Sequence, residues 1–380
     1  MIARIIIPLL LFSLLACLRI DRRCLRGRSS RRLFLWGPAV AFCGYSVYLA
    51  LQPDFLPANP LLLDVWFALL TLLAVPLWVF ALFCGLRKTV AAALALLAAL
   101  GCLYGFTLGF SRLEVKHLTL YVDDLPHSFD GYRIVHFSDI HLGSFYGWRH
   151  RLPQRDIDSI RALGADLICF TGDLQNVQAS EVQPYRQLLS TLHAPDGVYT
   201  VLGNHDYSWY LSGSAPEKAA AERRVVATEK RLDWRLLDNG RVVIHRGGDS
   251  IWLAGTANYD RPRHTDVRKA LSGIPRGAFV VMLQHIPKQW RTTWPDSIQH
   301  VWARKGEHLV APRLTLSGHT HGGQIRLLGL RPSMFTPFDD GLYEHLGCQL
   351  YTTRGLGGAF PFRLGCTAEI VELTLKCRKH

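Results

Sequence analysis

Five short polar motifs constrain the fold of this chain, because each directly follows an apolar run typical of a buried strand. The motifs are Ser-Asp-Ile-His, Thr-Gly-Asp, Gly-Asn-His-Asp, the His of Leu-Gln-His, and Gly-His-Thr-His. The preceding runs are short and rich in β-branched and aromatic residues: 133–137, 166–170, 198–202, 279–283 and 314–316. Helical spacing over 151–163 and 182–192 predicts that strands and helices alternate, as in a layered α/β domain.

Seven side chains in these motifs are suited to binding metal ions. They are carboxylates, imidazoles and one amide: Asp139, His141, Asp173, Asn204, His285, His319 and His321. In open α/β sheets such groups gather at the carboxyl ends of the strands, so residues far apart in sequence can meet. This ligand set fits Mn, Fe, Zn or similar ions. One carboxylate can bridge two ions about 3.5–4 Å apart, and the sequence therefore predicts a site for two divalent metal ions.

The ordered motifs resemble those of the calcineurin-like metallophosphoesterases, and the resemblance covers roughly Val115 to Leu375. It implies a four-layer α/β sandwich, in which two packed mixed sheets are flanked by helices. It also implies how the metals are shared: Asp139, His141 and His321 on the first, Asn204, His285 and His319 on the second, and Asp173 between them.

The resemblance implies catalytic roles for two further residues. His205 would protonate the leaving oxygen or steady the phosphoryl group, and Asp206 would orient His205. Arg326 and Arg354 are candidates for binding phosphate oxygens, since Arg can do so in bidentate fashion. Either arginine could instead pair with a structural carboxylate.

The first 111 residues are a different kind of sequence, with four long apolar runs at about 5–18, 33–51, 61–86 and 89–110. The last three are long enough, at about 20 residues, to cross a bilayer. The first is shorter. It is followed by seven arginines and not by a small-x-small cleavage site, so we interpret it as a span, with a signal-peptide core as the alternative. We expect a membrane region over 1–111 and the metallophosphoesterase domain over 112–380.

The basic residues indicate an orientation. The arginines after the first run and the Arg87-Lys88 pair would stay in the cytoplasm, whereas the loop from Gln52 to Asn59 has no basic residue. We therefore expect a multi-pass protein of the cell (inner) membrane with an extracytoplasmic domain.

The charge of the chain restricts the classes of partner that we expect it to bind. Of 43 basic and 30 acidic residues, residues 1–111 hold 10 and 3, so the remainder is only mildly basic. Such a domain suits a phosphorylated small molecule or lipid and a membrane surface. No nucleic-acid motif is present, and we predict no protein partner.

None of the nine cysteines forms C-x-x-C, which argues against zinc knuckles and redox motifs. A Cys348–Cys366 disulfide is an open alternative.

Two segments resemble a bacterial subgroup that is often membrane-anchored or exported: Ser317 to Arg326 and Arg354 to Arg363. The chain departs from that subgroup twice. Lys288 stands where an acid is usual, and the segment up to Asp260 lacks an adjacent acid pair. Residues 290–310 contain three tryptophans, which would form either a substrate lid or a surface loop packed on the domain.

The resemblance implies an enzyme that hydrolyses a phosphomonoester, phosphodiester or pyrophosphate bond by in-line attack of metal-bound hydroxide. The membrane region favours an envelope or lipid substrate. One alternative is UDP-2,3-diacylglucosamine pyrophosphate hydrolysis in lipid A synthesis, a cytoplasmic step that conflicts with the expected orientation. Another is a catalytically silent metal-binding scaffold. A transporter is disfavoured, because the spans contain almost no ionisable residue except Asp64.

Overall fold

The chain forms two compact units. The computed structural model describes residues 3–26, 29–52, 59–145, 147–305 and 308–378. The first unit is Met1–Phe110 with Tyr210–Ser212 and Phe360–Leu364, and the second is the remainder. The division differs from the expected boundary after residue 111 by one residue and by the two short segments that join the first unit.

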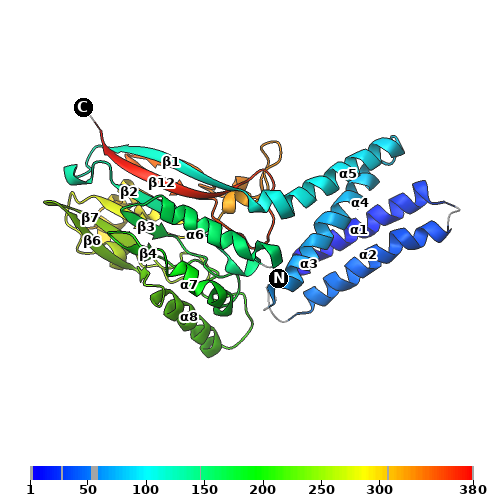
Figure 1. Cartoon of the computed structure of the whole chain (residues 1–380), viewed down its shortest axis with the longest axis horizontal. Helices are drawn as coiled ribbons and strands as arrows, with labels where there is room; N and C mark the ends of the chain where they lie inside the picture. Colours follow the sequence, from blue (N-terminus) through cyan, green and yellow to red (C-terminus); the bar gives the residue numbers. More distant parts are fainter. Residues whose placement is uncertain (1–2, 27–28, 53–58, 146, 306–307, 379–380) are drawn as a thin grey trace. The chain divides into compact units, whose positions relative to one another are not determined.

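The first unit is helical (Figure 1). Its elements are α1 (Ala3–Cys24), α2 (Ser29–Ala50), α3 (Pro60–Leu69), the π-helical η1 (Leu70–Ala74), α4 (Val75–Phe83), α5 (Lys88–Tyr104) and the π-helical η2 (Gly105–Gly109). Side-chain hydrogen bonds join the helices; for example, the Trp66 indole donates to Ser46 at 2.8 Å. Segment 360–364 belongs here because Phe360 stacks on Phe67 with ring centroids 4.4 Å apart.

Three helical stretches are long and apolar enough to cross a membrane: Ser30–Ala50, Leu61–Phe83 and Lys88–Gly109. At about 1.5 Å per residue, each matches a hydrocarbon core about 30 Å thick. They correspond to the last three predicted runs. The first run lies in α1, which is not among these candidates in the described part of the chain, so a fourth span stays a prediction. Residues 53–58 of the loop expected outside lie beyond the described residues.

The second unit contains two six-stranded mixed sheets. In order across the first, the strands are β1 (Leu113–Val122), β12 (Ala368–Cys377), β2 (Arg133–Phe137), β3 (Leu167–Phe170), β4 (Val198–Thr200) and β5 (Arg235–Leu236). Across the second they are β10 (Gly341–His345), β11 (Cys348–Thr352), β9 (Leu314–Ser317), β8 (Val280–Leu283), β7 (Asp249–Gly255) and β6 (Gly240–Arg246). The strands β2 to β5 are mutually parallel, as are β11, β9, β8 and β7.

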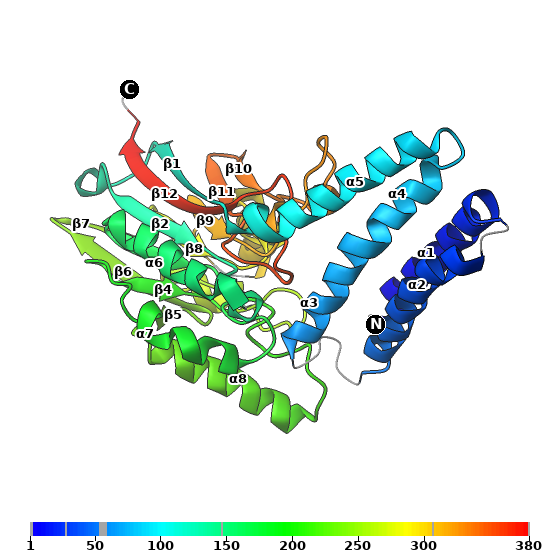
Figure 2. The same ribbon diagram turned by 45° about the vertical axis from the view of Figure 1, so that its right-hand side comes forward.

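Alternation along β8 shows how the layers stack. Val281 and Leu283 belong to the core that joins the two sheets, whereas Val280 and Met282 pack against α9 (Val267–Leu271) on the outer face. The helices α6 (Leu152–Ala162) and α8 (Ala215–Lys230), with the single turn α7 (Arg186–Leu189), lie along the first sheet (Figure 2). The predicted four-layer sandwich is therefore confirmed.

Short helical turns complete the second unit. They are η3 (His127–Phe129), η4 (Leu142–Ser144), η5 (Gly147–Arg151), η6 (Ala179–Tyr185), η7 (Pro287–Thr293), α10 (Pro295–Ser297), η8 (Ile298–Trp302), η9 (Ala303–Lys305), η10 (His321–Gly323) and η11 (Pro332–Phe335). The helix predicted over 182–192 is realised as η6 followed by the single turn α7.

The C-terminal strand corrects one prediction. In the sequence, Ile370, Glu372 and Thr374 alternate with Val371, Leu373 and Leu375, which predicts one water-exposed face, and we expect 351–353 and 369–375 to complete a second sheet together. Instead β12 lies between β1 and β2 in the first sheet, and β11 lies in the other. Glu372 is buried because His117 and Arg133, on the two neighbouring strands, pair with its carboxylate. Ion pairing across the sheet replaces the water that the pattern suggested.

Candidate metal centre

The structure brings the seven predicted ligands together at the carboxyl ends of five strands. Asp139 and His141 follow β2, Asp173 follows β3, and Asn204 follows β4; from the second sheet, His285 follows β8, and His319 and His321 follow β9. Backbone hydrogen bonds connect these loops, such as Asp139 N to Gly172 O at 2.9 Å and Gly318 N to His285 O at 3.1 Å. The sheet register therefore fixes the relative positions of the ligands.

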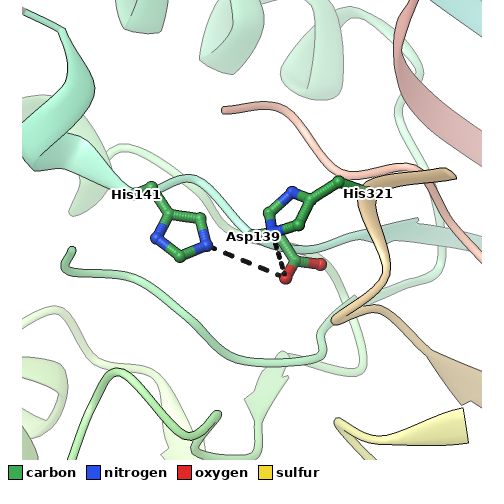
Figure 3. A group of neighbouring side chains, drawn as sticks. All are labelled: Asp139, His141 and His321. Atoms are coloured by element: carbon green, nitrogen blue, oxygen red, sulfur yellow. Dashed lines mark ion pairs between the residues drawn. The ribbon is translucent and has the colours of Figure 1, made fainter. Parts of the chain in front are cut away.

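One group contains Asp139, His141 and His321. Figure 3 shows both imidazoles turned toward the Asp139 carboxylate. Nε2 of His141 lies 4.0 Å, and Nε2 of His321 3.6 Å, from Oδ1 of Asp139. These ligand atoms lie close enough together to hold one ion.

A second group surrounds Nε2 of His285. That nitrogen lies 3.2 Å from Oδ2 of Asp173, 3.1 Å from Oδ1 of Asn204 and 3.2 Å from Nδ1 of His319. Oδ2 of Asp173 is also 3.5 Å from Nε2 of His141, which belongs to the first group. The Asp173 carboxylate thus lies between the two groups.

The second group fits a cation better than a hydrogen-bond network. Nδ1 of His285 faces the carbonyl oxygen of Thr171 at 2.7 Å, and since a carbonyl only accepts, this nitrogen carries a hydrogen. Nε2 then carries either one hydrogen or one lone pair and can make only one hydrogen bond, yet three oxygen or nitrogen atoms face it within 3.2 Å. Ligands about 2.1 Å from one ion lie about 3.0–3.4 Å apart. The observed spacings are those of neighbouring ligands.

Buried atoms without a hydrogen-bond partner indicate that the first group also fits a cation. Both ring nitrogens of His141 are buried without a hydrogen-bond partner among the described residues. Burial lowers the pKa of His141 and of His319 to about 3, so each is the neutral imidazole that metal binding requires.

The carboxylates create a demand for positive charge. Burial raises the pKa of Asp139 to about 7. Burial opposes protonation of His285, but the Asp173 carboxylate outweighs it and raises the pKa of His285 to about 9. Imidazoles, and no Arg or Lys, form the ion pairs recorded for Asp139 and Asp173 in the described chain. Divalent cations would supply the missing charge, so the residues fit the metals that the sequence implies.

The backbone at the ligands is strained. Asp139, His141, Asp173, His319 and His321 all have positive φ, between 48° and 74°. Such conformations cost non-glycine residues on the order of 1–3 kcal/mol and persist where the surroundings enforce them, often at functional sites. No pattern in the sequence predicted these backbone conformations.

His205 lies beside the ligands. Its ring centroid is 4.6 Å from that of His141, and its Nδ1 lies 2.6 Å from the carbonyl oxygen of Asn176. Because that oxygen only accepts, Nδ1 donates the hydrogen bond. His141, Asp173 and His205 also lie close enough to form a third candidate ligand group, so geometry alone leaves His205 suited to ligation or to proton transfer.

Asp206 has a different role from the one expected. Its buried carboxylate accepts backbone N–H groups of Gly203 at 2.9 Å, Asp173 at 2.8 Å, Leu174 at 2.9 Å and Gln175 at 3.3 Å. It therefore joins the loops after β3 and β4. The group that faces Nδ1 of His205 is the Asn176 carbonyl.

Asn176 and Glu181 are residues that sequence reasoning missed. The Glu181 carboxylate accepts the backbone N–H of Asn176 at 2.6 Å, of Val177 at 2.9 Å and of Gln178 at 3.1 Å. This fixes the loop whose carbonyl orients His205. The Gln178-x-x-Glu181 spacing, a capping box at the start of η6, was the available signal.

The two candidate arginines form ion pairs with carboxylates. Arg326 pairs with Asp340, and Arg354 pairs with Glu114 at 2.7 Å and Glu369 at 2.5 Å. This geometry favours the structural alternative, and phosphate binding by either stays a prediction.

The segment with three tryptophans packs on the domain. Trp290 is buried against Trp294, with ring centroids 5.4 Å apart, and against Phe338 at 5.2 Å. The Trp302 indole donates to Thr292 O. The surface-loop alternative is therefore the one observed. All nine cysteines are described and none forms a disulfide, so the Cys348–Cys366 disulfide is not formed.

Known proteins similar to this chain include metallophosphoesterases. The family described as calcineurin-like phosphoesterase matches residues 132–323. A Danio rerio "Transmembrane protein with metallophosphoesterase domain" is 30% identical over 312 residues, 76% of this chain and 63% of the relative, so the match spans less than two thirds of that protein. The Bacillus subtilis "Uncharacterized metallophosphoesterase YkuE" is 29% identical over 75% of this chain and 93% of its own length. A solved Mycobacterium tuberculosis phosphopantetheinyl hydrolase is similar with a TM-score of 0.36 and 11% identity, over 60% of this chain and 91% of that one.

Proposed function

Because this chain belongs to the calcineurin-like phosphoesterase family, we propose that it hydrolyses phosphate esters with two divalent metal ions held by the seven side chains. The observation that carries the proposal is the convergence on His285 Nε2 of three potential metal-ligand atoms within 3.2 Å. Asp139, His141 and His321 would hold one ion, Asn204, His285 and His319 would hold the other, and Asp173 would be shared between them. The ions would polarise the phosphoryl group and lower the pKa of water. Hydrolysis of bis(4-nitrophenyl) phosphate with added Mn²⁺ tests the proposal.

The chain's own residues position the proton donor and protonate the leaving oxygen. The Asn176 carbonyl fixes Nδ1 of His205 as a donor, so Nε2 is the nitrogen that gives a proton to the leaving oxygen. Asp206 holds the backbone of the Asp173 loop, and the Asp173 carboxylate accepts the His205 N–H at 2.9 Å. These contacts maintain the distance between the proton donor and the bridging carboxylate.

His205→Gln is expected to lower kcat for bis(4-nitrophenyl) phosphate about a hundredfold, the usual worth of general acid–base catalysis. The variant should bind Mn²⁺ as the unchanged protein does, because His205 is not assigned as a ligand. A loss of bound metal equal to the loss of activity would instead make His205 a ligand, as its nearness to His141 and Asp173 allows.

We propose an envelope or lipid substrate, and two observations support this. Three helices of the chain can cross a membrane. In the second unit an apolar loop follows His321. Leu327 and Leu330 pair across a tight turn, and the Leu328 side chain between them is 96% exposed. Further along the same loop, the Phe335 side chain is 89% exposed. Arg331 and Ser333 bind Asp339 and hold the base of the loop. Apolar side chains presented on a fixed loop suit a bilayer interface.

Replacing Leu328 and Phe335 together by Asp is expected to remove the activation of hydrolysis by lipid aggregates. The test substrate is a dihexanoyl glycerol 4-nitrophenyl phosphodiester, assayed below and above its critical micelle concentration. We expect wild-type rates to rise about tenfold on aggregation, since one buried apolar side chain contributes about 1.5–3 kcal/mol. Leu346→Asp, at another exposed leucine, should keep the activation. Equal activation in the double variant would rule the loop out.

We further propose that the second unit is extracytoplasmic, on the strength of the arginines that follow the first apolar run. Protease added to intact spheroplasts should cleave the second unit; full protection until lysis would place it in the cytoplasm.

A further inference from the structure

A basic cavity of about 1010 Å³ lies in the second unit. Four cationic side chains and a single carboxylate contribute to its walls: Arg261, Arg263, Lys288, Arg291 and Asp260. Trp209 and Tyr259 add aromatic surface. The cavity therefore has a strong excess of positive charge.

The sheet topology places this cavity at the edge that carries the metal ligands. β7 and β8 are parallel, with Gly255 opposite Leu283, so the loops that follow them leave the same edge of the sheet. The first loop carries Arg261 and Arg263. The second carries His285 and, three residues on, Lys288.

The arginine-bearing loop is fixed by hydrogen bonds. Asn258 Nδ2 donates to Pro262 O at 2.8 Å, and Asn239 Oδ1 accepts the N–H groups of Ala257 at 3.1 Å and Asp266 at 2.7 Å. His264 stacks on Tyr207, with centroids 5.0 Å apart. The loop conformation is therefore set before a ligand arrives, which lowers the entropy lost on binding.

The positive charges are mostly uncompensated. Lys288 pairs with Asp260 at 2.6 Å. This ion pair connects Lys288, which stands where the bacterial subgroup usually has an acid, to the end of the segment that lacks the subgroup's adjacent acid pair. Arg261, Arg263 and Arg291 form no ion pair within the described residues; Arg263 lies over the Tyr259 ring, and Arg291 over Phe338. Guanidinium groups held against aromatic rings remain able to bind phosphate-type oxygens.

We propose that this cavity binds a second phosphate-type anion of the substrate, on the part that remains outside the metal centre. The proposal rests on the hydrolase function proposed above. It restricts the substrate to a phosphate ester with another dianionic group, whether in a soluble molecule or in a lipid headgroup. No bond to this second group is broken, so it contributes to KM and not to kcat.

A matched substrate pair tests the proposal on the full-length protein. Two 4-nitrophenyl phosphodiesters carry 3-hydroxypropyl or 3-phosphonopropyl as the second substituent; the phosphonate cannot be hydrolysed, and both release nitrophenol. We expect a KM about tenfold lower for the phosphonate, the worth of one charge-assisted hydrogen bond. Equal KM values in this pair and also in the lipid-linked pair described below, with the substrates hydrolysed, would overturn the proposal and leave the hydrolase function intact. Failure to hydrolyse either would remove both.

Variants with opposite expected effects distinguish a loss of anion binding from a loss of folding. Arg263→Gln with Arg291→Gln should remove the preference for the phosphonate, whereas Asp260→Asn should increase it by releasing Lys288. Arg223→Gln removes the same charge from the exposed face of α8 and should keep the wild-type preference. If the double variant keeps the preference, the cavity does not bind the anion.

A second pair of substrates, with the same groups on a dihexanoyl glycerol backbone, distinguishes a lipid headgroup from a soluble molecule as the source of the second anion. A preference in this pair alone assigns the anion to a lipid headgroup, and a preference in both pairs admits soluble substrates too. A preference in neither contradicts the proposal.

Discussion

Asp173→Asn is expected to lower kcat/KM for bis(4-nitrophenyl) phosphate by at least about a thousandfold, which is on the order of 4 kcal/mol. Oδ2 of Asp173 lies 3.2 Å from Nε2 of His285 and 3.5 Å from Nε2 of His141, one from each ligand group. An amide keeps the shape but removes the negative charge that would face both ions. The loss should therefore exceed that of any single imidazole ligand.

Asp158→Asn is the matched control for that change. Asp158 is an exposed carboxylate on α6 that pairs with Arg161 at 3.3 Å. Its replacement should leave kcat/KM within about twofold, since exposed ion pairs contribute little. If Asp173→Asn retained a tenth of wild-type activity at saturating Mn²⁺, a bridging role for this carboxylate would be excluded.

Asp206→Ala is expected to cause the largest loss of stability, about 3–5 kcal/mol in the free energy of unfolding of the second unit. The substitution leaves buried N–H groups of Gly203, Asp173, Leu174 and Gln175 without their common acceptor. Each unsatisfied buried donor costs about 1–3 kcal/mol, and local relaxation recovers part of the sum.

Thermal unfolding followed by near-ultraviolet circular dichroism measures the effect. In a unit of this size we expect the melting temperature to fall by about 10 °C. Asp158→Ala, which removes an exposed carboxylate, should leave the melting temperature within about 1 °C. An unchanged melting temperature for Asp206→Ala would mean that the carboxylate is not the link between the two loops.

The sequence predicted the strands that carry the ligands because their pattern is local. Runs such as 133–137 are apolar on both faces, and β2 has the predicted bounds. The motif order then located seven polar side chains at strand ends, where parallel strands bring them to one edge. The structure places all seven there.

Other features depend on tertiary contacts that no local pattern encodes. Glu372 alternates with apolar residues as if it faced water, yet Arg133 and His117 from neighbouring strands cover it. The role of Asp206 depends on the distance between the loops after β3 and β4. Arg261 and Arg263 share a cavity with Lys288 only because β7 and β8 are parallel and in register.

Metal content tests the central claim most directly, since the proposed chemistry depends on two ions that share the Asp173 carboxylate. The full-length protein would be loaded with Mn²⁺, Fe²⁺ or Zn²⁺, dialysed, and analysed by mass spectrometry for bound metal per chain. We predict two ions in the wild type and at most one in Asp173→Asn. A folded wild-type protein that retains no ion, whichever metal is supplied, would contradict this account.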